Sequence, residues 1–217
     1  MLYFAKIPKL VRDYYSSYIW QVKTDEKVVY LTFDDGPTPV ITEWVLEQLA
    51  EYDALATFFL IGQNIQEHPE LARQVMAAGH AIGNHTQTHI NGWKADSDLY
   101  LEDVQRGWET IQDNLNLETA FFRPPYGRIK PSQAKVIQKT QQVVMMDVMS
   151  GDFDTNLEGE KCLQNVIQHS APGSIVLLHD SVKAWKRLNT ILPQILKQLK
   201  SEGYRFDKLT PELFAAK

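Results

Sequence analysis

Most of the side chains that could do chemistry lie in three short segments, far apart in the chain. They are residues 32–37 (TFDDGP), residues 85–89 (HTQTH) and residues 178–180 (LHD). These segments supply two adjacent carboxylates, two histidines four residues apart and a third histidine beside an acid. Imidazole and carboxylate groups bind hydrolytic metal ions while leaving positions open for water and substrate. The set therefore predicts a mononuclear metal hydrolase with one base and one acid to spare.

The two carboxylates, Asp34 and Asp35, end a predicted strand and come directly before Gly36-Pro37, which favours a turn. Adjacent side chains leaving a strand point to different sides. One carboxylate can therefore reach a metal ion while the other stays free beside it. A turn with two solvated carboxylates is the alternative interpretation of this dipeptide alone.

The histidine pair, His85 and His89, is flanked by threonines. A helical turn beginning at Thr86 would face both imidazoles the same way, which suits the binding of one ion. A pair of surface or core histidines is the alternative. No such pattern surrounds the three histidines that receive only structural interpretations, namely His68, His80 and His169.

Two further groups follow predicted strands. His179 ends the apolar run 174–178, where it could act as a general acid because the pKa of a histidine is easily tuned across neutrality. Arg123 precedes two prolines that stiffen residues 121–127, so its guanidinium is fixed and suited to hold a carboxylate by a bidentate contact. The alternatives are a histidine that satisfies a strand-end carbonyl and a structural arginine salt bridge.

The elements that must position these groups alternate between short strands and longer helices. The predicted strands are residues 27–33, 56–61, 80–84, 120–122, 142–148, 174–178 and 204–209. The predicted helices are one beginning at Pro39 with Thr38 as its N-cap, then residues 69–78, 99–115, 131–139, 157–169 and 188–202. An open doubly wound sheet and a closed βα barrel both fit. Candidate groups follow five different strands, since Asp152 comes after the fifth. The barrel is therefore favoured, because its chemistry gathers from many strand ends on one face.

Composition limits the remaining possibilities. A chain of 217 residues fits one domain, here an N-terminal arm over residues 1–24 and a barrel domain over residues 25–217. The net charge of -5 argues against nucleic acid, and no apolar run is long enough to cross a membrane. No signal peptide is recognisable, so a cytoplasmic location is the default expectation.

The single cysteine, Cys162, excludes an internal disulfide and is expected as a buried thiol in an amphipathic helix. Nothing assigns an oligomeric state.

Four motifs in this order (TFDDGP, HTQTH, RPPYG and LHD) resemble the polysaccharide deacetylase family, whose members remove acetyl groups from chitin, peptidoglycan, xylan and related sugars. The resemblance spans about residues 28–180 in motifs. It implies an incomplete, TIM-barrel-like (β/α)7 fold, in agreement with the independent count of about seven strands.

The resemblance also implies the metal site and the base. Asp35, His85 and His89 would hold one divalent ion, zinc, with cobalt or nickel as substitutes. Asp34 would be the general base that activates the attacking water. Arg123 would orient Asp34 and restrain its ionisation.

The implied acid and substrate contacts lie on later segments. His179 would protonate the leaving amine, oriented by Asp152, with Asp154 as a rival for that role. The backbone N–H of Tyr126 would stabilise the oxyanion. Residues 147–154 (DVMSGDFD) depart from the family's Asp-x-x-Asp-Trp, because Phe153 stands where a groove-lining tryptophan is expected. Phenylalanine keeps the apolar wall but loses the indole donor, which bears on substrate preference. The implied substrate contacts are Pro124, Tyr126, Phe153 and Leu177.

The prediction is thus a metal-dependent hydrolase that deacetylates an N-acetylated sugar. One alternative is hydrolysis of another C–N bond, as in deformylation of a lipid-linked sugar or opening of a cyclic imide. A second is a catalytically silent carbohydrate-binding relic, which should lack a base or a ligand. A two-carboxylate glycosidase is disfavoured because Asp34 and Asp35 are adjacent and cannot flank a glycosidic bond. Trp93, four residues after His89, could stack on a sugar or serve only in packing.

Overall fold

A parallel sheet that curves into an incomplete barrel forms the centre of the molecule. The computed structural model describes residues 4–215. Seven strands follow the order β5-β4-β3-β2-β1-β7-β6, and β8 (Arg205–Phe206) pairs with the beginning of β1. The seven are β1 (Val28–Asp34), β2 (Ala56–Leu60), β3 (Ala81–Asn84), β4 (Phe121–Phe122), β5 (Gln142–Val143), β6 (Val148–Met149) and β7 (Ile175–His179). The predicted incomplete seven-stranded barrel is confirmed.

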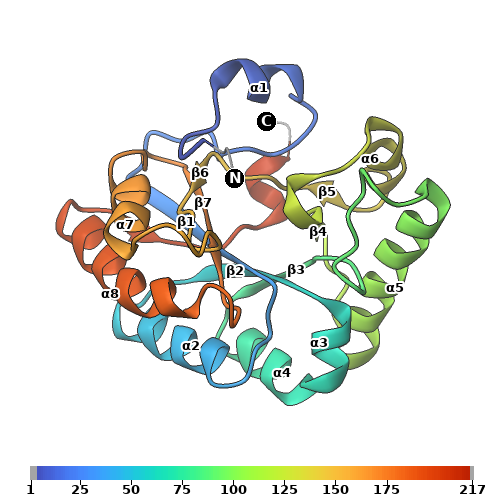
Figure 1. Ribbon diagram of the computed structural model, residues 1–217, viewed down its shortest axis with the longest axis horizontal. Helices are drawn as coiled ribbons and strands as arrows, with labels where there is room; N and C mark the ends of the chain where they lie inside the picture. Colours follow the sequence, from blue (N-terminus) through green and yellow to red (C-terminus); the bar gives the residue numbers. More distant parts are fainter. Residues whose placement is uncertain (1–3, 216–217) are drawn as a thin grey trace.

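Helices surround this curved sheet on its outer side, except the first, which lies over the open side of the barrel (Figure 1). They are α1 (Lys9–Tyr14), α2 (Ile41–Glu51), α3 (Gly62–Glu67), α4 (Pro69–Ala77), α5 (Ser97–Leu115), α6 (Pro131–Ile137), α7 (Gly159–Ile167) and α8 (Trp185–Ser201), with 3-10 turns at Pro125–Gly127 and Pro211–Phe214. The sequence did not predict α1 and α3. The predicted start of α2 is also wrong, because Val40 has a left-handed φ of 69° and the helix begins only at Ile41. No helix among the described residues is long and apolar enough to span a membrane.

Strand alternation divides the side chains into two layers. In β1, Leu31 and Phe33 join the outer core beneath α7 and α8, whereas Tyr30 belongs to the inner cluster of the barrel. Because side chains alternate along a strand, Thr32 and Asp34 share the inner face with Tyr30. The same alternation in β7 places Ile175 and Leu177 inside, with His179 next on that face. The last inward-facing residues of β1 and β7 are therefore polar and lie at the mouth of the barrel.

The predicted single strand over residues 142–148 is wrong, because this stretch forms two strands at opposite edges of the sheet. The N–H of Val144 donates to Phe122 of β4, whereas the N–H of Asp147 donates to Ile175 of β7. The chain stays extended but changes partners between those two residues. The segment therefore spans the opening of the barrel, joining β5 to β6.

N-terminal residues lie along this opening. Bridges link Ile19 to Val144 and Lys6 to Val148, and the Lys6 ammonium also pairs with the buried Asp147. Figure 1 shows the segment that carries α1 over the open side, between β6 and β5. Residues 1–3 of the predicted arm and residues 216–217 of the predicted barrel domain lie outside the described part of the chain.

Candidate active site

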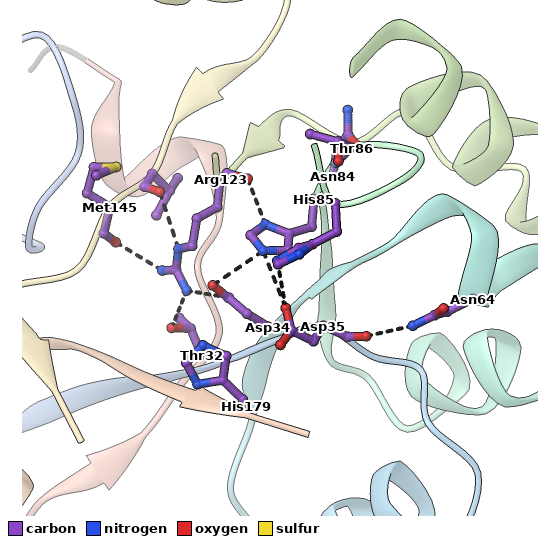
Figure 2. Close-up of polar contacts among 12 residues, drawn as sticks. Thr32, Asp34, Asp35, Asn64, Asn84, His85, Thr86, Arg123, Met145 and His179 are labelled. Carbon is purple, nitrogen blue, oxygen red and sulfur yellow. Dashed lines mark hydrogen bonds and ion pairs between the residues drawn. The ribbon is translucent and has the colours of Figure 1, made fainter. Parts of the chain in front are cut away.

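Side chains from the separate motifs meet at the carboxyl ends of the strands. Figure 2 shows Asp34 at the end of β1 and Asp35 directly after it, His85 after β3, Arg123 after β4 and His179 at the end of β7. Parallel strands end on the same face of a barrel, so groups distant in the sequence converge there. These five side chains lie together at this face of the barrel.

Three of these groups form a candidate metal centre. Asp35, His85 and His89 each offer one ligand atom, and these atoms all lie within 4.8 Å of one another. The Asp35 Oδ1 atom is 3.1 Å from His89 Nε2 and 3.7 Å from His85 Nε2. Two imidazoles and one carboxylate are a suitable donor set for a hydrolytic divalent ion.

The segment that carries both histidines is not the helical turn expected from its spacing. Thr86 and His89 have left-handed φ values of 68° and 58°. The Asp103 carboxylate of α5 accepts hydrogen bonds from the N–H groups of Gln87 and Thr88 and from the Thr88 hydroxyl, at 2.9–3.0 Å. Asp103 thus fixes the conformation of the loop although it lies 15 or more residues away from Gln87 and Thr88 in the sequence. No local pattern in the sequence predicted this role.

His85 is held in the tautomer that metal binding requires. Its Nδ1–H donates to the Arg123 carbonyl at 2.7 Å, which leaves the Nε2 lone pair directed toward Asp35. Burial lowers the pKa of His85 to about 4, and this outweighs the opposing charges of Asp34 and Asp35. The imidazole is therefore neutral at neutral pH, as a ligand must be.

Asp35 is ionised at neutral pH. Burial by itself raises the pKa of this carboxyl group. A hydrogen bond from His89 and the charges of His179, His85 and His89 outweigh burial and bring the pKa well below its usual range. The Asn64 side chain donates to the Asp35 carbonyl at 2.7 Å and steadies the turn. A neutral imidazole beside an ionised carboxylate fits a divalent cation.

Arg123 holds Asp34 from inside the barrel. The guanidinium is fully buried and donates from one nitrogen to Asp34 Oδ1 at 2.8 Å and to the Thr32 hydroxyl at 2.7 Å. Its other nitrogens donate to the carbonyls of Val144 and Met145 at 3.3 and 2.9 Å. The expected bidentate contact is wrong, because the remaining donors satisfy the segment that leaves β5. The second Asp34 oxygen lies 3.8 Å from His85 Nε2 and faces the metal side.

His179 and Asp152 form a second acid–base pair. The His179 Nδ1–H donates to Asp152 Oδ1 at 2.8 Å, and the His179 backbone N–H donates to Oδ2 at 2.8 Å. Burial lowers the pKa of His179, but the charge and hydrogen bond of Asp152, helped by Asp35 and Asp34, raise it overall to about 9. The structure thus places the carboxylate of Asp152 against this ring. The Asp152 carbonyl in turn accepts from Arg187 at 2.7 Å.

Asp180, adjacent to His179, points to the helix layer. It is fully buried, accepts a short hydrogen bond from the Thr42 hydroxyl, and donates its N–H to the Asp34 carbonyl at 3.2 Å. Burial raises its pKa to about 8, with the charges of Asp35 and Asp34 adding to the effect. A Cβ on Gly36 would lie 2.1 Å from Asp180 Oδ2. The turn after β1 therefore needs glycine here, and Asp180 is a neutral packing group.

The four predicted substrate contacts differ in exposure. Tyr126 is 59% exposed, and its ring centre lies 4.6 Å from that of His89. Phe153 is half-buried and packs edge-on against His179 at 5.4 Å. Pro124 and Leu177 are buried. Tyr126 and Phe153 therefore present more surface at the site than the other two.

Comparison with known proteins gives a consistent result. Residues 21–145 match the polysaccharide deacetylase family. A peptidoglycan-N-acetylglucosamine deacetylase from Bacillus cereus is 36% identical over 189 residues, which cover 86% of this chain and 88% of the relative.

Two solved structures share the fold. One is a peptidoglycan N-acetylglucosamine deacetylase in complex with 4-naphthalen-1-yl-N-oxidanyl-benzamide, with a TM-score of 0.85, 32% identity, and coverage of 93% of this chain and 94% of the other. The second is a CE4 family pseudoenzyme from Bacillus anthracis, with a TM-score of 0.79, 28% identity, and coverage of 90% and 68%. The fold therefore occurs in both an active enzyme and a pseudoenzyme. Whether a protein with this fold is catalytically active has to be argued from the side chains of its site.

Proposed function

This chain belongs to the polysaccharide deacetylase family, and we propose specific roles for its residues in the hydrolysis of an N-acetylated glycan. It is a metal-dependent hydrolase that acts on carbon–nitrogen bonds other than peptide bonds. One observation carries the assignment of roles: an Arg-held carboxylate and an Asp-held imidazolium lie at the same Asp-His-His centre. A silent relic should lack one of these groups, and none is missing.

Two proton transfers are proposed, one to Asp34 as the base and one from His179 as the acid. A divalent ion held by Asp35, His85 and His89 would polarise the acetyl carbonyl and acidify a water molecule. Asp34 accepts the proton of the attacking water at Oδ2, while Arg123 holds Oδ1 in place. His179 then donates its Nε2 proton to the departing nitrogen, while its Nδ1–H stays on Asp152. The N–H of Tyr126 donates to the oxyanion.

Zinc is the proposed ion, with cobalt or nickel as functional substitutes. Two imidazoles and one carboxylate are a familiar donor set of catalytic zinc sites. The proposed substrate is a glycan of N-acetylated amino sugars, of the peptidoglycan or chitin type. Similarity to a peptidoglycan-N-acetylglucosamine deacetylase over most of both chains supports this choice.

Acetate release from N-acetylglucosamine oligomers and from peptidoglycan tests the proposal. A chelator should abolish release, and added zinc should restore it. The protein should turn over formylated sugars and cyclic imides far more slowly than acetylated glycans. If the zinc-loaded protein releases no acetate from either glycan, or prefers an imide, the proposed reaction is wrong.

Replacing Asp152 should narrow the pH range of activity. Asp152 raises the pKa of His179, so Asp152→Asn should lower that pKa and deprotonate the acid at a lower pH. The alkaline limb of the kcat/KM profile should move toward acid by about one pH unit or more, and the loss should be larger at pH 9 than at pH 6. Asp154→Asn is the matched control and should leave the limb in place. A limb that stays put in Asp152→Asn, or moves in both variants, would contradict this assignment.

A further inference from the structure

An exposed aromatic ring and a cation lie together near the mouth of the barrel. Neither belongs to the catalytic groups or metal ligands described above. Trp93 is 59% exposed, and the Arg128 guanidinium carbon lies 5.2 Å from the centre of its ring. The two residues come from different loops, one after β3 and one after β4. We call this pair the Trp93–Arg128 shelf.

The shelf adjoins the reaction centre. Trp93 follows the metal ligand His89 by four residues, and Arg128 follows Tyr126 by two. The rings of His89 and Tyr126 are in contact, with centres 4.6 Å apart. The shelf therefore lies beside the surface formed by His89 and Tyr126.

The fold fixes the shelf before any ligand binds. The Trp93 indole N–H donates to the Ile129 carbonyl at 3.1 Å, and the buried Gln133 donates to the Gly92 carbonyl at 3.0 Å. A Cβ on Gly92 would lie 2.6 Å from the Arg128 carbonyl, so the two loops touch through their backbones. Such a rigid arrangement reduces the entropy lost on binding.

The charge of Arg128 is left for a ligand. Among residues 4–215, no carboxylate forms an ion pair with its guanidinium, although the chain as a whole is acidic with a net charge of -5. An aromatic face packs against the C–H face of a sugar ring, and a guanidinium binds a carboxylate through parallel hydrogen bonds. Together these two groups suit a sugar that carries a carboxylate.

We propose that the Trp93–Arg128 shelf binds a carboxylate-bearing amino sugar next to the residue that loses its acetyl group. This inference rests on the proposed function and deepens it. It favours alternating glycans whose second sugar carries a lactyl carboxylate, as in peptidoglycan, over the neutral polymer of N-acetylglucosamine. Trp93 would contact both kinds of glycan, whereas Arg128 would distinguish between them.

Substrate preference tests this proposal. The probes are an N-acetylglucosamine tetramer and a tetrasaccharide that alternates N-acetylglucosamine with N-acetylmuramic acid. In Arg128→Gln the ratio of kcat/KM for the second probe over the first should fall about tenfold, mainly through KM, since a charged hydrogen bond contributes to binding. Arg128→Glu should lower the ratio further. Lys135→Gln is the matched control, because it removes one exposed positive charge from α6, and its ratio should equal that of the wild type.

The outcomes separate this proposal from the proposed function. A ratio that falls in both arginine variants but not in Lys135→Gln supports the shelf. An unchanged ratio in the arginine variants, or an equal fall in the lysine variant, overturns it. If the wild-type protein releases acetate from neither probe, the proposed function itself has failed.

Discussion

Asp34→Asn is expected to reduce kcat by a factor of about 10³, within the effect usual for loss of a general base. An amide cannot accept the proton of the attacking water. Its oxygen can still accept the hydrogen bond that Arg123 donates at 2.8 Å, so the side chain should keep its position. The metal ligands Asp35, His85 and His89 are unchanged, and zinc should bind as in the wild type.

Two measurements on the same preparation check this expectation. Acetate release gives kcat, and calorimetric titration of the metal-free protein with zinc gives affinity and stoichiometry. Asp113→Asn makes the same chemical change on the exposed face of α5 and should match the wild type in both. A variant that keeps more than about a tenth of the activity would show that Asp34 is not the base. Lost zinc binding would place Asp34 among the ligands instead.

Arg123→Met is expected to lower the free energy of unfolding by about 3–5 kcal/mol, the usual cost of breaking a buried ion pair by removing one partner. Arg123 is fully buried, and its guanidinium satisfies Asp34, Thr32 and the carbonyls of Val144 and Met145. Without it, these acceptors lose their donors and the Asp34 charge stays buried without a counter-ion. Activity should fall as well, because Asp34 is no longer held.

Urea denaturation of five proteins tests this account. They are the wild type, Arg123→Met, Asp34→Asn, the Arg123→Met/Asp34→Asn double variant and the control Arg73→Met. The double variant should lose less stability than the two single losses added, because it contains no uncompensated buried charge. Arg73→Met removes an exposed pair with Glu70 and should cost less than about 1 kcal/mol. Additive losses, or a loss in Arg123→Met no larger than in Arg73→Met, would contradict the buried-pair account.

The sequence was sufficient for those features that depend on local patterns. Alternation along β1 and β7 placed Asp34 and His179 at strand ends, and parallel strands then required them to meet on one face. The stiff segment after Arg123 correctly indicated a fixed guanidinium. The alternation of strands and helices fitted both an open sheet and a barrel, the polar groups after the strands favoured the barrel, and the family resemblance implied that it is incomplete.

Other features depend on partners distant in the chain, and local patterns could not reveal them. The loop that holds His85 and His89 takes its shape from Asp103, which lies on the next helix. Residues 142–148 form two short strands instead of one, because the first part pairs with β4 and the second part pairs with β7 at the other edge of the sheet. Asp180 owes its neutrality to burial, which outweighs the hydrogen bond that it accepts from Thr42. Each is set by tertiary contacts, on which spacing and propensity carry no information.

The two-layer alternation in β7 has a consequence for how the gene can change. Successive side chains point to opposite faces of the sheet, so His179 faces the reaction centre and Asp180 faces the helix layer. Deleting or inserting one codon within β7 would exchange these directions, sending the imidazole into the helix layer and the neutral acid into the mouth of the barrel. A change in the length of the strand would therefore disturb both faces at once, whereas a point substitution changes only one side chain. Natural length variation should therefore accumulate in the loops, while the strands that carry the site keep a constant residue count.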